Sequence, residues 1–366
     1  MKRYKVPENF GSYSREDVVF LLKNLNGLID EKSNEEREAV VQNGGHYSEM
    51  LPVEYFPTEE YIRLFHTILQ DTKVKVAEAV AVVAEIIKEK RSSNLVLASL
   101  ARAGTPIGIL IKRYIQAKYG ITLPHYSISI IRGKGIDKNA LRFILQTHPD
   151  ADIQFIDGWT GKGSIKTTLE AALKDFYHSD AIELDPTLAV VADPGECVPI
   201  CGTKEDFLIP SACLNATVSG LISRTVLRDD LIGEDDFHGA KFYKEWQQDD
   251  LSNMFIDTIT ECFGKTDVDT TDLEQYVNCM SDKGIKEMKL IQERFGISDI
   301  NRIKPGVGET TRVLLRRMPW KILVNSLDNP NLKHIVLLAK DRNVPIEIYK
   351  DMGYGCCGLI KSVKEI

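Results

Sequence analysis

The sequence has no uninterrupted apolar run close to the roughly 20 residues that a membrane-spanning helix needs. Met1 to Tyr4 lead into polar residues rather than into the apolar core of a signal peptide, so we expect a cytoplasmic protein that does not enter a membrane. The seven cysteines are an odd number, which fits reduced thiols better than a disulfide framework. Cys197 and Cys201 lack a second pair of metal ligands nearby, and this argues against a zinc site.

The overall composition is that of an ordinary folded protein. The 366 residues include 43% hydrophobic and 27% charged residues, and the length suggests two or three domains. The net charge of −7 argues against non-specific binding of nucleic acid by the whole surface. Basic residues gather at Arg312, Arg316 and Arg317 on a predicted helix, where they are candidate contacts for RNA or another anion. The alternative is a helix face that is simply exposed to solvent.

Strand-like and helix-like segments alternate over residues 94–192, which predicts an α/β fold with a parallel sheet flanked by helices. The predicted strands cover residues 94–100, 126–131, 153–156 and 188–192, and helices are predicted at 107–119 and 165–176. Three of these strands end on turns that contain glycine and basic residues. Because the carboxyl ends of parallel strands share one edge, Arg102, Arg132, Lys134 and Lys162 are expected to converge on one polyanionic ligand.

The third of these turns, Asp157-Gly158-Trp159-Thr160-Gly161-Lys162-Gly163-Ser164, is typical of a phosphate-binding turn. Glycines allow successive backbone N–H groups to face an anion, hydroxyl groups add donors, and the helix that follows directs its positive end to the same place. The turn is not a nucleotide P-loop, because Lys162 is followed by Gly163 instead of serine or threonine.

Longer motifs carry a family resemblance. The segments RAGTPIG, HYSISIIRGKGID, FIDGWTGKGS, IPSACLNATVSGLISRTVL and PGVGETTRVLLRR resemble the phosphoribosyltransferase-like proteins of bacterial tellurite-resistance and stress operons. The same family is also described as a cysteine protease family of the StiP type. The resemblance covers most of residues 40–366 and implies a type I phosphoribosyltransferase-like fold. It also implies binding of a phosphorylated ribose compound, such as phosphoribosyl pyrophosphate, with Mg²⁺, and transfer to an unknown base or RNA-derived acceptor.

The resemblance also implies roles for individual residues. Asp157, Arg132 and Lys134 would be catalytic, with Asp157 holding ribose hydroxyls or Mg²⁺. Gly158 departs from the pattern, because phosphoribosyltransferases have a second acid there. The implied substrate-binding residues are Arg102, Ala103, Gly104, Thr105, Gly158, Trp159, Thr160, Gly161, Lys162, Gly163 and Ser164.

Two other functions stay open. In a cysteine protease, Cys213 would be the nucleophile, because it lies among small residues that could hold a thiolate at a helix N-terminus. His125 or His238 would be the base and Asn215 a polar partner, although a lone cysteine among apolar residues is more often a small buried hydrophobe. The third alternative is a non-catalytic sensor that binds RNA or a nucleotide.

The domain prediction follows the changes along the chain. We expect a helical N-terminal region over residues 1–90, with helices at 16–28 and 58–90, the first suited to packing or oligomer contacts. The phosphoribosyltransferase-like domain follows over 91–228, and a helical insertion or linker over 229–300. Residues 301–366 form a small α/β unit, which from Trp320 onward resembles the pelota-type RNA-binding domain and implies RNA as a partner.

Overall fold

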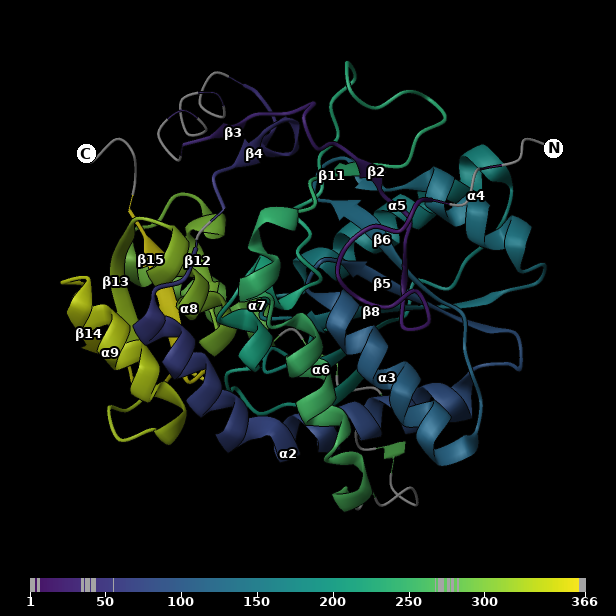
Figure 1. Cartoon of the computed structure of the whole chain (residues 1–366). Helices are drawn as coiled ribbons and strands as arrows, with labels where there is room; N and C mark the ends of the chain where they lie inside the picture. Colours follow the sequence, from purple (N-terminus) through teal and green to yellow (C-terminus); the bar gives the residue numbers. More distant parts are fainter. Residues whose placement is uncertain are drawn as a thin grey trace.

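The computed structural model describes residues 4, 7–33, 36, 40, 44–54, 56–266, 268, 273–274, 277, 280–281 and 283–361, and the side chain of Arg316 lies outside this description. A mostly parallel sheet occupies the centre, and a smaller sheet unit built from the C-terminal part of the chain lies to one side of it (Figure 1). Among the described residues, no helix is both long enough and apolar enough to cross a membrane.

The central sheet has the strand order β1-β6-β5-β8-β9-β10, and every neighbouring pair along this path is parallel. The short strand β7 is added to β6 in the antiparallel direction. The strands are β1 (Val19–Phe20), β5 (Leu95–Ala101), β6 (His125–Ile131), β7 (Gly135–Ile136), β8 (Asp152–Trp159), β9 (Leu188–Ala192) and β10 (Ile200–Thr203). The predicted parallel α/β sheet is therefore confirmed.

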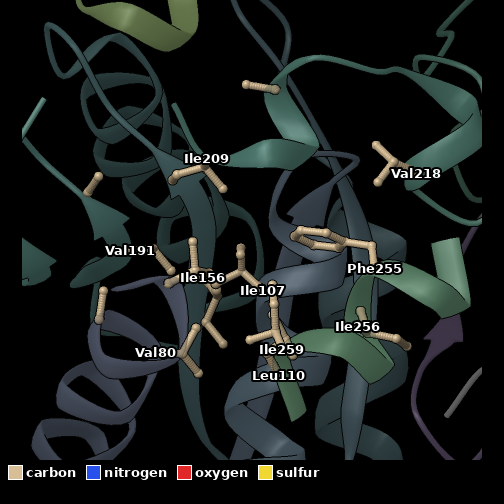
Figure 2. Packing of buried hydrophobic residues seen from close by; sticks show 14 of the residues in the cluster. Val80, Ile107, Leu110, Ile156, Val191, Ile209, Val218, Phe255, Ile256 and Ile259 are labelled. Atoms are coloured by element: carbon tan, nitrogen blue, oxygen red, sulfur yellow. The ribbon is translucent and has the colours of Figure 1, made fainter. Parts of the chain in front are cut away.

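Helices cover both faces of this sheet, as its continuous apolar strands require. One face packs against α2 (Glu59–Lys90) and α3 (Gly104–Tyr119), and α6 (Ser252–Thr260) packs on these two helices. The other face packs against α4 (Lys138–Thr147) and α5 (Ser164–Asp180). Figure 2 shows the first of these layers, with Ile156 of β8 directed at Ile107 of α3, both fully buried. Burial of each such side chain stabilises the fold by about 1.5–3 kcal/mol.

The long helix α2 forms where its sequence predicts a helix. Thr58 caps its first turn by accepting a hydrogen bond from Tyr61 N, and Glu59 and Glu60 lie near the positive end of the helix dipole. An apolar stripe that includes Val80, Ala84 and Ile87 is fully buried. The prediction of a helix over residues 58–90 is confirmed.

The C-terminal unit has its own sheet, in the order β12-β15-β13-β14. One side of it forms a separate apolar cluster, whereas Val307, Leu314 and Ile335 belong to the main core cluster. Helix α7 belongs to this unit, because Met288 and Ile291 pack with Ile303, Leu323 and Leu359. The unit therefore begins before residue 301, where the sequence places its start. Its elements are α7 (Lys283–Phe295), β12 (Ile303–Pro305), α8 (Val307–Arg316), β13 (Pro319–Val324), α9 (Lys333–Asp341), β14 (Ile346–Ile348) and β15 (Cys356–Ile360).

The helix predicted at residues 16–28 is wrong. This segment contains β1, which pairs with β6, and β2 (Lys23–Asn24), which pairs with β11 (Gly239–Ala240). Its apolar residues are buried by pairing at the sheet edge instead of by a helical stripe, and short apolar runs cannot distinguish the two. Two more short strands, β3 (Glu31–Lys32) and β4 (Leu51–Pro52), pair with each other.

Candidate functional site

Three strand ends meet at one edge of the central sheet, because β6, β5 and β8 are adjacent and parallel. The turn after β5 and the turn after β8 are in direct contact. A Cβ atom on Gly104 would lie 2.4 Å from Ile156 O and 3.1 Å from Asp157 Cα, and one on Gly158 would lie 3.1 Å from Ala103 O. Glycine is therefore required at position 104 so that the two backbones can approach each other.

Arg102 and Thr105 hold other parts of the fold. The Arg102 guanidinium makes a bidentate pair with Glu54, at 2.8 and 3.2 Å, and also donates to Ile222 O at 2.8 Å. The side chains of both pair members are largely buried. Thr105 is fully buried, and its hydroxyl shares a 2.7 Å hydrogen bond with Ser127 Oγ. These contacts tie the turn to the N-terminal segment and to β6.

The glycine-rich turn after β8 is closed by the C-terminal unit. Thr160 Oγ1 accepts a hydrogen bond from Gly163 N at 3.0 Å, and Gly161 O accepts one from the Tyr354 hydroxyl at 2.6 Å. Lys162 Nζ donates to Ile300 O at 3.2 Å. The cavity beside Trp159, Thr160 and Gly161 has a volume of about 10 Å³. That volume accommodates about one water molecule, so a sugar phosphate does not fit.

Asp157 lies beneath α8 at this closed turn. Removal from water raises the pKa of its carboxyl to about 7, although Gly158 N donates to it at 2.8 Å and Arg312 favours the charged form. The Arg312 guanidinium lies 4.6 Å from the centre of a Trp159 ring, and its Nη1 is 3.4 Å from Glu309 Oε1. Arg312 therefore contributes to the contact between the two units, whereas Arg317 is exposed to solvent and the Arg316 side chain lies outside the described residues.

A larger cavity of about 620 Å³ lies between α5, the β6–β7 turn and α7. It brings together Arg132, Lys134, Lys162 and Ser164 among the residues singled out in the sequence. Burial, and secondarily the charge of Arg132, lower the pKa of Lys162. The cavity is lined by Arg132, Gly133, Lys134, Gly135, Lys162, Ser164, Thr167, Thr168, Ala171, Ala172, Asp175, Ile285, Met288, Ile300 and Asn301.

Cys213 follows the one-turn 3-10 helix η2 (Pro210–Ala212), and it does not begin a helix as expected for a thiolate site. The residue is 1% exposed and belongs to the main core cluster. Two polar residues lie two positions from it in the sequence. Ser211 Oγ and Asn215 Oδ1 are buried, and neither has a hydrogen-bond partner among the described residues. Segment η2 packs against α2 and α8, at the junction of the two units.

The two histidines proposed as bases are engaged elsewhere. His125 Nε2 pairs with Ser99 Oγ at 2.7 Å and its Nδ1 with Asp17 O at 2.8 Å, and burial lowers its pKa to about 3. His238 Nδ1 pairs with Ser129 Oγ at 2.8 Å, and burial lowers its pKa as well. The ring nitrogens Nδ1 and Nε2 of His125 and Nδ1 of His238 thus have partners other than Cys213.

Cys197 is a second thiol at the sheet edge, which the sequence did not single out as a nucleophile. It is half-buried, whereas the other described cysteines are buried. A Cβ atom on Gly163 would lie 3.7 Å from its Sγ, so the thiol is next to the glycine-rich turn. Burial and then the charge of Asp193 raise the pKa of Cys197 to about 12, which disfavours the thiolate. Its position after β9, at the same edge, is the signal that could have drawn attention to it.

Comparison with known proteins identifies both units. A family model described as tellurite-like stress resistance cysteine protease StiP matches residues 11–260, and one described as PELOTA RNA binding domain matches residues 282–362. The chain is 32% identical over 352 residues to "Cysteine protease StiP" of Acinetobacter baylyi, covering 93% of this chain and 91% of that protein. A crystal structure of a hypothetical protein from Neisseria gonorrhoeae with bound ppGpp is 13% identical and covers 32% of this chain and 66% of its own. Its TM-score is 0.21, too low to relate the two structures.

These findings show that the prediction of a phosphoribosyltransferase is wrong. Both the family and its curated relative are named cysteine proteases, which is the alternative that the sequence left open. At the turn expected to hold ribose phosphate, Gly161 O is bound by the Tyr354 hydroxyl and Lys162 Nζ by Ile300 O. The Mg²⁺ expected at Asp157 stays a prediction. Within the described ranges, no group of three or more His, Cys, Asp or Glu side chains is arranged to hold a metal ion.

Proposed function

Because the chain belongs to the StiP family of tellurite-like stress resistance cysteine proteases, we propose that it cleaves peptide bonds with the thiol of Cys213 during a stress response. One structural observation carries the choice of Cys213. Ser211 and Asn215 lie two residues to either side of it, and each keeps a buried polar atom without a partner among the described residues. Buried polar atoms are paired in the great majority of cases, so two exceptions within two residues of one thiol support a ligand at this segment.

The chemistry of these two side chains suits a peptide. The Ser211 hydroxyl can donate to a substrate carbonyl oxygen, and Asn215 Oδ1 can accept a peptide N–H. Cys213 Sγ would attack the carbonyl carbon, the carbon–nitrogen bond would break, and the amine would leave with the thiol proton. Water would then hydrolyse the thioester and restore the thiol. Since Cys213 is 1% exposed, a substrate reaches it only after the covering segment moves.

The test compares Cys213→Ala and Cys213→Ser with Cys201→Ala. Cys201 is a matched control, because it is also fully buried and lies in β10. Cleavage of fluorescein-labelled casein by the purified full chain is measured, together with labelling by a peptidyl vinyl sulfone mapped by mass spectrometry. We expect both Cys213 variants to lose at least 100-fold in cleavage rate, while their circular dichroism and the activity of Cys201→Ala stay at wild-type values.

Two results would contradict this assignment. Normal cleavage by Cys213→Ala, with loss of cleavage in Cys197→Ala, would move the nucleophile to the half-buried thiol. Vinyl sulfone labelling of Cys213 no faster than that of Cys201 would show that the thiol behaves as a core residue, as buried cysteines usually do.

We also propose that the chain binds RNA, a second function favoured by the C-terminal unit. The match to a PELOTA RNA binding domain supports it, and so do the basic residues that this unit adds to the sheet edge. Lys304 is half-buried, and its pKa is lowered to about 8 by burial and by the nearby charges of Lys162, Arg132 and Arg317, against the opposite effect of Glu309. Such crowding of cations favours an anionic partner. Binding of a fluorescein-labelled RNA 15-mer to the full chain, measured by fluorescence anisotropy, tests this function.

A further inference from the structure

The walls of the 620 Å³ cavity come from both units. Arg132 and Lys134 come from the β6–β7 turn, Lys162 from the glycine-rich turn, and Asn301 from the C-terminal unit. The cavity lies on the α5 side of the glycine-rich turn, in which Gly161 O accepts a hydrogen bond from the Tyr354 hydroxyl. It is therefore distinct from both the 10 Å³ space beside Trp159 and the Cys213 segment.

The charge in this cavity is positive and only partly balanced. Arg132 has no hydrogen-bond or ion-pair partner for its side chain within the described residues, and the Lys134 ammonium is 3.8 Å from Glu49. Among the described residues of the lining, Asp175 is the only acid. Lys162 is held by a neutral carbonyl, that of Ile300, rather than by a carboxylate. An anion that enters the cavity would relieve the repulsion between Arg132 and Lys162.

The remaining walls supply the other features of a nucleotide unit. Thr167 and Thr168 donate their hydroxyl hydrogens to backbone carbonyls of α5, at 3.3 and 2.9 Å, so their oxygens keep lone pairs that can accept from a ribose 2′-hydroxyl. Opposite them, Ile285 of α7 presents an apolar side chain suited to the face of a base, and Met288 lies buried beneath it in the core of the C-terminal unit. Ile285 is 46% exposed, so its side chain is accessible to a ligand in the cavity.

We propose that this cavity between the two units binds a single-stranded RNA segment. The strand would place a backbone phosphate at Arg132 and Lys162, a ribose at the threonines of α5 and a base on α7. This inference rests on the proposed RNA binding and extends it, because it makes the β6–β7 turn and α5 of the protease-family domain part of the RNA site. RNA is favoured over DNA, since the hydroxyl oxygens of Thr167 and Thr168 line the cavity with lone pairs that can accept from a 2′-hydroxyl.

The experiment measures the anisotropy of a fluorescein-labelled RNA 15-mer of mixed sequence with the full-length chain, over a series of salt concentrations. Arg132→Gln removes a charge that has no described protein partner, so the fold should be unaffected. Lys174→Gln is the matched control, because Lys174 is an exposed residue of α5 that does not line the cavity. We expect Arg132→Gln to weaken RNA binding about tenfold and to lower the slope of log Kd against log salt by about 0.7, the value of one single-strand phosphate contact. Lys174→Gln should bind as the wild type does.

The outcomes separate this inference from the function on which it rests. Wild-type affinity and salt dependence in Arg132→Gln would overturn the cavity site, while RNA binding by the chain would stand. No binding by the wild type would overturn the RNA function and the cavity site together. A DNA 15-mer that binds as tightly as RNA would overturn the 2′-hydroxyl contact. Displacement of the RNA by a micromolar nucleoside monophosphate would overturn the strand as the occupant, because it would show that the cavity binds a free nucleotide.

Discussion

The raised pKa of Asp157 leads to a prediction about stability with a definite sign. The pKa of this carboxyl rises from 3.8 to about 7 on folding, mainly because burial disfavours the charged form. The folded protein therefore holds the proton more tightly than the unfolded chain does. The associated stability is fully present below about pH 4 and is lost as the pH rises through 7. Above pH 7 the folded state retains a carboxylate whose protein contacts only partly replace its lost hydration.

Asp157→Asn should remove this loss, because asparagine resembles the protonated acid and its side-chain oxygen can still accept from Gly158 N. One pKa unit corresponds to about 1.4 kcal/mol, so the shift sets an upper limit of about 4 kcal/mol. Asp157 is partly exposed, and solvent screening lowers the expected gain to about 2 kcal/mol at pH 8. At pH 4 the variant and the wild type should have the same free energy of unfolding.

Urea unfolding at pH 4, 6 and 8 measures this difference directly. Asp71→Asn, which removes an exposed carboxylate from α2, is the matched control and should show no gain that grows with pH. A constant difference between Asp157→Asn and the wild type at all three values would refute the reasoning. A loss of stability at pH 8 would show that attraction to Arg312 outweighs the cost of burial.

Three further substitutions test the contacts that build the sheet edge. Gly104→Ala should destabilise the chain by about 3 kcal/mol in urea unfolding, because its Cβ would lie 2.4 Å from Ile156 O; an unchanged midpoint would mean that the two turns can move apart. Asp206→Ala should loosen the C-terminal unit by about 3 kcal/mol or more, because the carboxylate accepts two backbone N–H groups of that unit at 2.8 Å. Limited trypsin digestion should then separate the two units sooner than in the wild type, and equal digestion rates would contradict the role of this contact. Tyr354→Phe should cost about 1 kcal/mol through the lost bond to Gly161 O, and no change in urea midpoint would show that the bond adds nothing.

The same contacts explain how the C-terminal unit changes the glycine-rich turn. Tyr354 binds Gly161 O, and Arg312 lies over Trp159, so two side chains of that unit occupy the place where an anion was expected. The anion site that we propose lies instead in the neighbouring cavity, which Arg132 and Lys162 line. The family match at residues 11–260 and the RNA-binding match at 282–362 thus contact each other at the glycine-rich turn.

The sequence by itself determined the local elements and their order. Helix α2 and the strands β5, β6, β8 and β9 follow from apolar periodicity, from the Thr58 cap and from glycine at the strand ends, all of which depend on neighbouring residues. The parallel arrangement also follows, because strands joined by helices pair in that direction. The longest motifs were sufficient to indicate the family, although both of its described activities remained open.

Only the tertiary structure decided how the side chains at these turns are used. Arg102 has the expected position but pairs with Glu54, a residue 48 positions away. The glycine-rich turn is closed by Tyr354, 193 positions from Gly161, and the burial of Cys213 depends on the packing of η2 against α2 and α8. Short apolar runs such as Val18–Leu22 were also decided by pairing partners distant in the chain. Local patterns specify backbone conformation, whereas the partner of a buried charge or thiol is set by contacts between segments that the sequence places far apart.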